Sequence, residues 1–163
     1  MVRRTDRRLR ELELLYQTRF PRFLQVARAI TGDRERAAEA VQDAFVGLVR
    51  TRNAFRGEGP MEAWAWRAVV NAARNATRRP LVKVGRIDDE PVYLMPETVA
   101  ELAPLIAGLP ERQRLAVFLR YYADLDYRAI AIALDVEVGT VSATLAAAHA
   151  GLRKQLGKVN TDV

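Results

Sequence analysis

The chain has 163 residues, of which half are hydrophobic, so it is long enough for one ordinary domain or two small ones with real cores. Its 26 Lys and Arg against 20 Asp and Glu give a net charge of +6, which favours an anionic partner such as nucleic acid or a lipid surface. The chain has no cysteine and one histidine, which excludes a disulfide framework and a Cys or His metal cluster. We therefore expect neither a metal nor another cofactor.

The positive charge is concentrated in the first half of the chain. Residues 1–80 carry a net +8, residues 81–97 carry −2, and residues 98–163 are neutral. Electrostatic attraction to nucleic acid should therefore come mainly from the first half. The basic N-terminus lacks the apolar run of a signal peptide, and no stretch of about 18 apolar residues exists for a membrane span. We expect a cytoplasmic protein.

Apolar residues recur at steps of three and four, and strand signals are nearly absent, which predicts an all-α protein. The first helix should place one apolar face inward, formed by Leu12, Leu15 and Tyr16. A second helix should open near Pro21, because proline suits the first turn of a helix. After a break at residues 31–33, Asp33 is the predicted N-cap of a third helix.

The third helix has two stripes of different character. Its core stripe is Ala37, Val41, Ala44, Phe45 and Leu48. The opposite stripe has no obvious partner within the domain and should face outward; it comprises Glu39, Gln42, Asp43 and Val46.

A loop at residues 56–60 leads into a fourth helix, predicted from about Met61 to Arg79 and ending at Pro80. One face of it is basic and rich in amides: Trp64, Arg67, Asn71, Arg74, Asn75 and Arg78, with Arg56 in the preceding loop. Arginines can neutralise phosphates, asparagines can bond base edges, and a tryptophan can stack on an unpaired base. A basic stripe alone usually means a solvated face, but the aromatic within it and the glycine-rich loop before it favour nucleic-acid binding. The opposite side carries Trp66, Val69, Val70, Ala73 and Thr77, and Trp66 should belong to the core.

The proline-containing, acidic segment 81–97 is the predicted linker between a domain at 1–80 and a domain at 98–163. In the second domain, Thr98 and Glu101 form a capping box, and Pro110 suits the first turn of the following helix. Asp126 should cap a further helix, which a short turn at 135–137 separates from a last one. Two short helices across a tight turn predict a helix-turn-helix.

In the last helix, residues 139–149 would form the recognition helix, but the exposed positions there are small and uncharged. Base-edge readout usually uses Arg, Lys, Asn or Gln. Hydroxyls can still bond phosphates, and alanines can contact thymine methyl groups, so we expect low affinity. The candidate DNA-binding residues are Thr140, Ser142, Ala143, Thr144 and His149, of which the histidine is more often a neutral helix residue than a phosphate contact.

These pieces, in this order, resemble the sigma factors of the extracytoplasmic-function type, in which a linker joins two helical domains. The resemblance covers most of the chain. It rests on residues 27–33 (ARAITGD), 37–45 (AAEAVQDAF) and 64–67 (WAWR), on Asn71 and residues 78–79, and then on residues 109–114 (LPERQR), 126–131 (DYRAIA), 138–141 (VGTV) and 152–153 (LR).

The resemblance implies a role for each part of the chain. The outward stripe of the third helix would dock on the beta-prime clamp of core RNA polymerase. The loop at 56–60 and the fourth helix would open and read the minus-ten element, and the helix-turn-helix, held near the beta flap, would read the minus-thirty-five element of promoter DNA. An anti-sigma factor is a further candidate partner, and catalysis would belong to the polymerase.

Three positions depart from the family pattern. Ala40 replaces a common acidic residue, Ala129 replaces the capping-box glutamate, and Asp135 replaces a turn glycine. Together with the neutral recognition helix, they leave open an alternative, a sigma-like regulator or adaptor that binds polymerase or another protein without selecting promoters. A small helical hydrolase is disfavoured because no catalytic constellation is present.

Overall fold

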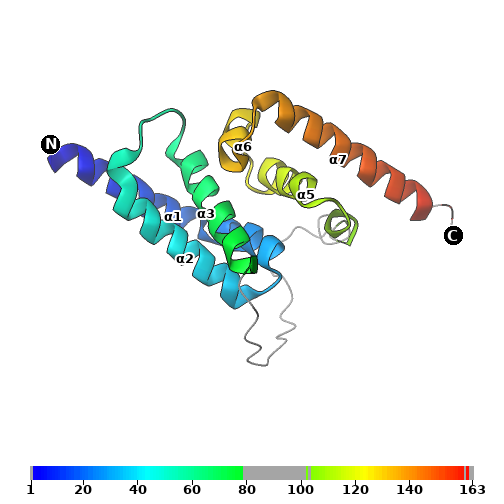
Figure 1. Ribbon diagram of the computed structural model, residues 1–163, viewed down its shortest axis with the longest axis horizontal. Helices are drawn as coiled ribbons and strands as arrows, with labels where there is room; N and C mark the ends of the chain where they lie inside the picture. The colour runs from blue at the N-terminus through cyan, green and yellow to red at the C-terminus, as the bar shows by residue number, and fades with distance from the viewer. Residues whose placement is uncertain (1, 79–101, 103, 160, 162–163) are drawn as a thin grey trace.

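The computed structural model describes residues 2–78, 102, 104–159 and 161, which form helices and turns only. The all-α prediction is therefore confirmed for these parts of the chain. The elements are, in order, α1 (Val2–Thr31), α2 (Arg34–Thr51), η1 (Arg52–Ala54), α3 (Met61–Arg78), α5 (Glu111–Val117), η2 (Phe118–Tyr122), α6 (Tyr127–Leu134) and α7 (Val138–Val159). They form two helical groups, α1 to α3 and α5 to α7 (Figure 1). The predicted linker at 81–97 and the capping box of Thr98 and Glu101 lie outside the described residues.

The prediction of two helices at the N-terminus is wrong, because α1 is one helix of 30 residues with Pro21 inside it. A proline inside a helix removes one hydrogen bond and costs roughly 3 kcal/mol or more. Here the apolar stripe continues across the proline in one register, through Leu12, Phe23 and Val26, all of which are buried. Burial of a continuous stripe against α2 and α3 offsets the local cost, so tertiary packing decides the outcome.

The first domain has an aromatic core between α1, α2 and α3. Trp66 of α3 is fully buried, with its ring centroid 4.3 Å from that of Phe23. Phe45 of α2 packs edge-on against Phe23 and Tyr16, at 5.3 and 5.0 Å. The predicted core stripe of α2 is buried throughout. Asp33 caps α2 as predicted, since its carboxylate accepts a hydrogen bond from the Arg36 N–H at 2.8 Å.

The second domain packs α5, η2 and α6 against the long α7. Pro110 is the N-cap of α5 rather than part of its first turn, and the helix changes to a π turn at Phe118 to Tyr122. Asp126 caps α6 as predicted, because its carboxylate accepts the Ala129 N–H at 2.8 Å. The fully buried residues of this domain include Leu115, Leu119, Ile130, Val141 and Leu145.

The α6–α7 pair has the geometry of a helix-turn-helix, with its arms at 98° to each other. Asp135 ends α6 in the left-handed region, at φ 55° and ψ 51°, where glycine is usual. An aspartate tolerates this conformation better than most residues, although it carries more strain there than glycine. The predicted turn is thus present, without the residue that suits its backbone best. Within the described ranges no single helix is long and apolar enough to cross a membrane. The α6–α7 pair has the necessary length and composition only when its two bent arms are taken together.

The two domains pack against each other, with α6 lying beside α3 (Figure 1). A smaller contact joins α1 to η2. At this contact burial raises the pKa of the Tyr122 phenol above its ordinary value, and the charge of Arg22 on α1 partly opposes the rise. The second domain therefore lies over one face of the first.

Candidate nucleic-acid interface

Helix α3 separates its residues into the two faces that the sequence predicts. Trp66, Val69, Val70 and Ala73 are fully buried, whereas Asn71, Asn75 and Arg78 are exposed. Trp64, Arg67 and Arg74 are half-buried on the same side as the exposed group. Thr77, near the helix end, is exposed, and its hydroxyl donates to the carbonyl of Arg74 at 2.6 Å.

Trp64 is held by the loop that precedes α3. Its ring centroid lies 5.2 Å from that of Phe55, with the planes inclined by 33°. The Arg8 guanidinium lies 5.9 Å from the Phe55 centroid and donates hydrogen bonds to the carbonyls of Arg52 and Asn53, at 3.0 and 3.2 Å. Sequence reasoning missed Arg8 and Phe55, because neither belongs to a periodic stripe that points to the site.

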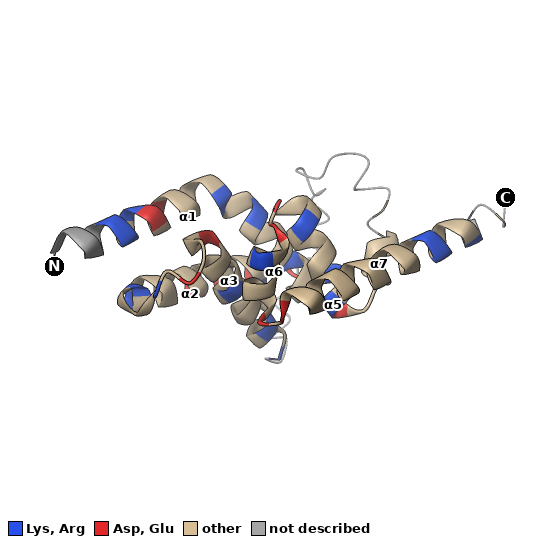
Figure 2. Ribbon diagram, turned by 90° about the horizontal axis from the view of Figure 1, so that it is seen from above, with Lys and Arg blue, Asp and Glu red and all other residues tan. Residues whose placement is uncertain are grey.

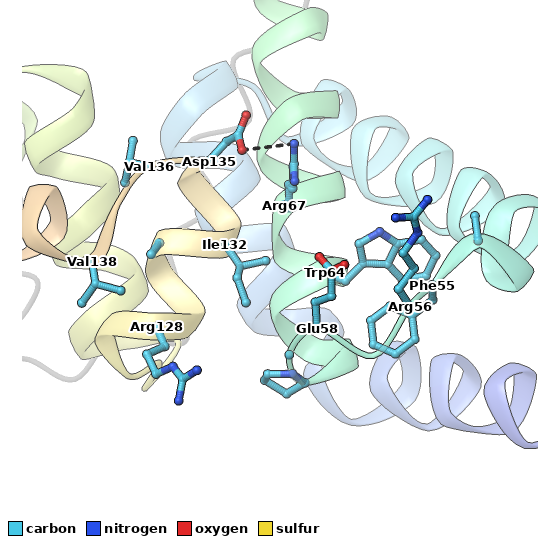
Figure 3. A pocket seen from close by; sticks show the side chains of 14 residues that line it. Phe55, Arg56, Glu58, Trp64, Arg67, Arg128, Ile132, Asp135, Val136 and Val138 are labelled. Atoms are coloured by element: carbon cyan, nitrogen blue, oxygen red, sulfur yellow. Dashed lines mark ion pairs between the residues drawn. The ribbon is translucent and has the colours of Figure 1, made fainter.

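A crevice of about 460 Å³ opens between the domains beside Trp64 (Figure 3). The first domain lines it with aromatic and charged side chains, among them Phe55, Arg56, Glu58, Trp64 and Arg67. The second domain lines it with residues of α6, the turn and the start of α7, among them Arg128, Ile132, Asp135, Val136 and Val138. Trp64, the predicted base-stacking residue, and residues of the helix-turn-helix therefore line the same crevice.

Two of the predicted DNA-binding arginines are ion-paired with the second domain. Arg67 Nη2 lies 3.3 Å from Asp135 Oδ1, and Arg74 Nε lies 3.0 Å from Glu111 Oε1. Figure 3 shows the first pair spanning from α3 to the end of α6. Figure 2 likewise shows acidic and basic segments together where α3 meets α6. The sequence predicted the exposure of these arginines but not their partners.

The outward stripe of α2 is exposed, as predicted: Glu39, Gln42, Asp43 and Val46 all face solvent. Val46 is 48% exposed, because it lies on the face of α2 opposite the buried Val41, Ala44 and Leu48. Ala40 is 3% exposed and belongs to the core. The stripe is therefore a polar surface with one apolar residue, and Ala40 does not contribute to it.

On α7, Ser142 and Ala143 are exposed and Thr140 and Thr144 are half-buried. Thr140, Ala143 and Thr144 border a shallow hollow that also includes Arg112 and Gln113 of α5, whereas Ser142 is not part of its lining. Sequence reasoning missed Arg112, which places a positive charge beside the uncharged residues 139–149 of α7; the contact between α5 and α7 brings it there.

His149 lies apart from these residues, because its Nε2 makes a 2.9 Å hydrogen bond with the hydroxyl of Tyr121 on η2. Within the described residues, no three His, Asp or Glu side chains gather closely enough to hold a metal ion.

The three-helix domain with its Arg- and Asn-rich face, followed by a helix-turn-helix domain, is the architecture of a helical DNA-binding protein. Family models agree with it along the chain: residues 15–80 match sigma-70 region 2, and residues 100–149 match sigma-70 region 4. The ECF RNA polymerase sigma factor SigM of Mycobacterium tuberculosis is 30% identical over 156 residues, covering 91% of this chain and 79% of that protein. The chain belongs to the family of ECF RNA polymerase sigma factors.

A second relative agrees with this assignment, and two solved structures share the fold. The ECF RNA polymerase sigma-E factor of Escherichia coli K12 is 32% identical over 123 residues, which cover 63% of this chain and 64% of that protein. The structure of CnrH in complex with the cytosolic domain of CnrY has a similar fold, with a TM-score of 0.70 at 21% identity, covering 92% of this chain and 90% of that one. The sigma factor RpoE in complex with the anti-sigma factor NepR from Bartonella quintana gives 0.67 at 15% identity, covering 90% and 97%.

Proposed function

We propose that this sigma factor binds core RNA polymerase and directs it to promoters, with the α3 face reading the minus-ten element. The observation that carries the proposal is the arrangement of Trp64, Arg67, Asn71 and Arg74 on one side of a helix whose other side is fully buried. Such a face can hold a separated strand, because arginines neutralise its phosphates while the indole stacks on a base. Phe55 and Arg8 would keep the indole and its loop in position.

The other two surfaces would complete the task. The exposed α2 stripe would dock on the beta-prime clamp, because its carboxylates and Val46 have no partner within the described parts of the chain and remain available to another protein. The α7 surface with Arg112 would contact the minus-thirty-five element. Because this surface carries little charge, it would bind DNA weakly by itself. The polymerase, at the beta flap, would hold it over the DNA and so raise its effective concentration there.

The chain itself would carry out no catalysis, and it would act in the cytoplasm, where the polymerase works. An anti-sigma factor is a candidate partner, because CnrH and RpoE, which share the fold, are each described in complex with a second protein.

The second candidate function is that of an adaptor that binds polymerase without selecting promoters. The uncharged first half of α7, residues 139–149, favours it, since weak readout there would leave promoter choice to another protein.

Transcription by reconstituted core polymerase, with and without this protein, separates the two functions. Genomic DNA from the source organism serves as template, and the 5′ ends of the transcripts are sequenced. A promoter-selecting sigma factor should create new start sites that share two upstream sequence elements. Binding to the polymerase without new start sites would instead support the adaptor. The double variant Arg67→Ala with Arg74→Ala tests the α3 face. It should bind polymerase but open promoters poorly.

A further inference from the structure

A hollow of about 470 Å³ lies between the start of α5 and the first half of α7. Figure 1 shows these two helices side by side, and they pack together directly. Residues with short side chains form the α7 side of the hollow: Gly139, Thr140, Ala143, Thr144 and Ala147. Since none of them reaches beyond its γ atoms, the space in front of them stays open. The α7 side therefore presents methyl and hydroxyl groups but no charge.

The α5 side of the hollow supplies the charge. Pro110, Arg112 and Gln113 border the hollow there, and Arg112 is the single charged residue in its lining. The Arg112 side chain is exposed, whereas Gln113 is half-buried. The hollow therefore combines a guanidinium from α5 with the methyl groups of α7.

Arg112 differs from the other two arginines of α5 and η2 because no described residue pairs with it. Arg114 Nη1 donates to the carbonyl of Ala107 at 3.1 Å. Arg120 Nη1 donates to the carbonyl of Leu125 at 3.2 Å, and its guanidinium lies over two tyrosine rings. No hydrogen bond or ion pair joins Arg112 to any residue that the structure describes. The fold thus uses two of these guanidinium groups, and the donors of the third remain available to another molecule.

The molecule that fits this combination of groups is DNA, bound through its major groove. An arginine can donate two hydrogen bonds to O6 and N7 of guanine, and alanine and threonine methyl groups can contact the methyl group of thymine. Thr140, Ala143 and Thr144 also belong to the predicted DNA-binding residues, so α7 would bring the hollow against the base edges. Their short side chains let the helix approach the bases closely. This close approach brings Arg112 within reach of the bases, although it belongs to α5.

We propose that Arg112 supplies the base-specific hydrogen bonds of the second domain, by donating to a guanine of the minus-thirty-five element while Ala143 and Ala147 contact the methyl group of a neighbouring thymine. The inference rests on the function proposed above and names the residue that reads this element. The helix-turn-helix holds the domain in the groove, whereas α5, which precedes it, distinguishes the bases. The chain can then select promoters although residues 139–149 of its last helix include no Arg, Lys, Asn or Gln.

A promoter library tests the assignment, with polymerase holoenzyme assembled from the full chain. The library carries one promoter that the unsubstituted protein uses, with its minus-thirty-five element randomised, and sequencing of the transcripts reports which variants of the element are used. Arg112→Ala should lose the preference for guanine at one position by about fivefold or more, because a bidentate arginine contact discriminates between bases by at least that factor. Preferences at the other positions should remain. Arg153→Ala, which removes an exposed arginine of α7 outside the hollow, is the charge-matched control and should keep every preference.

Arg112→Gln separates a contact with a base from a contact with a phosphate. Glutamine pairs with adenine, so this variant should shift the preference at that one position from guanine toward adenine. A phosphate contact would instead weaken the use of all sequences equally. Equal weakening across the library in Arg112→Ala and Arg112→Gln, without a change of preference at any position, would therefore overturn the proposal. The melting temperatures of both variants should match that of the unsubstituted protein, since Arg112 is exposed and pairs with no described residue.

A cross-link tests whether DNA or a protein occupies the hollow. Because the chain contains no cysteine, Gln113→Cys gives it a single thiol, and this thiol borders the hollow. A photoreactive label on the thiol reports what lies there in the complex of holoenzyme and promoter. We expect cross-links to bases of the minus-thirty-five element, whereas cross-links to a polymerase subunit alone would refute the proposal. The unsubstituted chain, treated with the same label, should give none.

The same measurements distinguish failure of this inference from failure of the proposed function. If the unsubstituted protein starts no transcripts with core polymerase, the proposed function is wrong and the inference fails with it. If the unsubstituted protein starts transcripts and Arg112→Ala keeps every base preference, the function stands and the inference is wrong.

Discussion

Tyr121 and His149 share a 2.9 Å hydrogen bond between the phenol oxygen and Nε2, which joins the π turn η2 to the solvent-facing part of α7. Their ring centroids are 5.8 Å apart. Tyr121 is 63% exposed, and Arg120 lies over its ring at 5.9 Å. The bond gives His149 a partner within the domain and links α7 to η2.

Tyr121→Phe should therefore lower the free energy of unfolding by about 0.5–1 kcal/mol, because it removes one exposed hydrogen bond and keeps the ring. Promoter use should change less than twofold. Thermal unfolding and run-off transcription measure the two effects. A large loss of transcription without loss of stability would indicate instead that His149 or Tyr121 contacts DNA.

Arg67→Ala with Arg74→Ala should weaken promoter binding by the polymerase holoenzyme and make it less dependent on salt. Each phosphate that the protein no longer neutralises reduces the slope of log affinity against log salt by about one. Binding at several salt concentrations, together with promoter opening, measures the effect. Arg10→Ala with Arg50→Ala, which removes two exposed arginines of α1 and α2, is the charge-matched control. Equal slopes for the two double variants would show that the α3 face has no special role.

Asp43→Lys should reduce affinity for core polymerase about tenfold or more, while the melting temperature stays within about 2 °C of the unsubstituted protein. The reason is that Asp43 is exposed on the α2 stripe, where surface substitutions change stability by about 0.5 kcal/mol or less. Glu13→Lys, the same reversal at an exposed position of α1, should leave polymerase affinity unchanged. Phe45→Ala, in contrast, should cost about 3–5 kcal/mol, because the ring is packed in the core. A sharp fall in melting temperature for Asp43→Lys would make the residue structural.

A fragment ending near Pro80 should bind mixed-sequence duplex DNA more tightly than the full chain at low salt. It keeps the net +8 of residues 1–80 and lacks the carboxylates that pair with Arg67 and Arg74. A fragment from Glu97 onward should bind poorly, since residues 98–163 are neutral. Binding isotherms at two salt concentrations measure both, after circular dichroism has verified that each fragment is helical. Tight, sequence-specific binding by the second fragment would contradict the interpretation of α7 as a weak recognition helix.

Asp126→Ala should destabilise the helix-turn-helix by about 1 kcal/mol, because it leaves the Ala129 N–H without its 2.8 Å bond. Ala129 itself carries no side-chain carboxylate that could complete a capping box, so no second cap compensates. Thermal unfolding gives the change. Asp126→Asn, which keeps the acceptor oxygen, should restore most of the stability; failure to do so would mean that the carboxylate acts by charge alone.

Much of the local structure could be predicted from the sequence, because it depends on neighbours a few residues away. The spacing of Trp66, Val69, Val70 and Ala73 fixes the buried face of α3, and with it the face that remains for Arg67 and Arg74. Asp33 and Asp126 are recognisable as caps because a cap bonds to the backbone three residues on.

The remainder depends on contacts between residues far apart, which periodicity does not contain. Pro21 breaks a helix by its own chemistry, but the packing of Leu12 and Phe23 in one continuous stripe keeps α1 whole. Arg112 reaches the α7 surface only because α5 and α7 pack together. Arg67 and Asp135 are 68 positions apart, and either alone is an ordinary exposed charge. Only the packing of α6 on α3 makes them partners, because an ion pair requires about 4 Å between groups and the sequence sets no distance between its two domains.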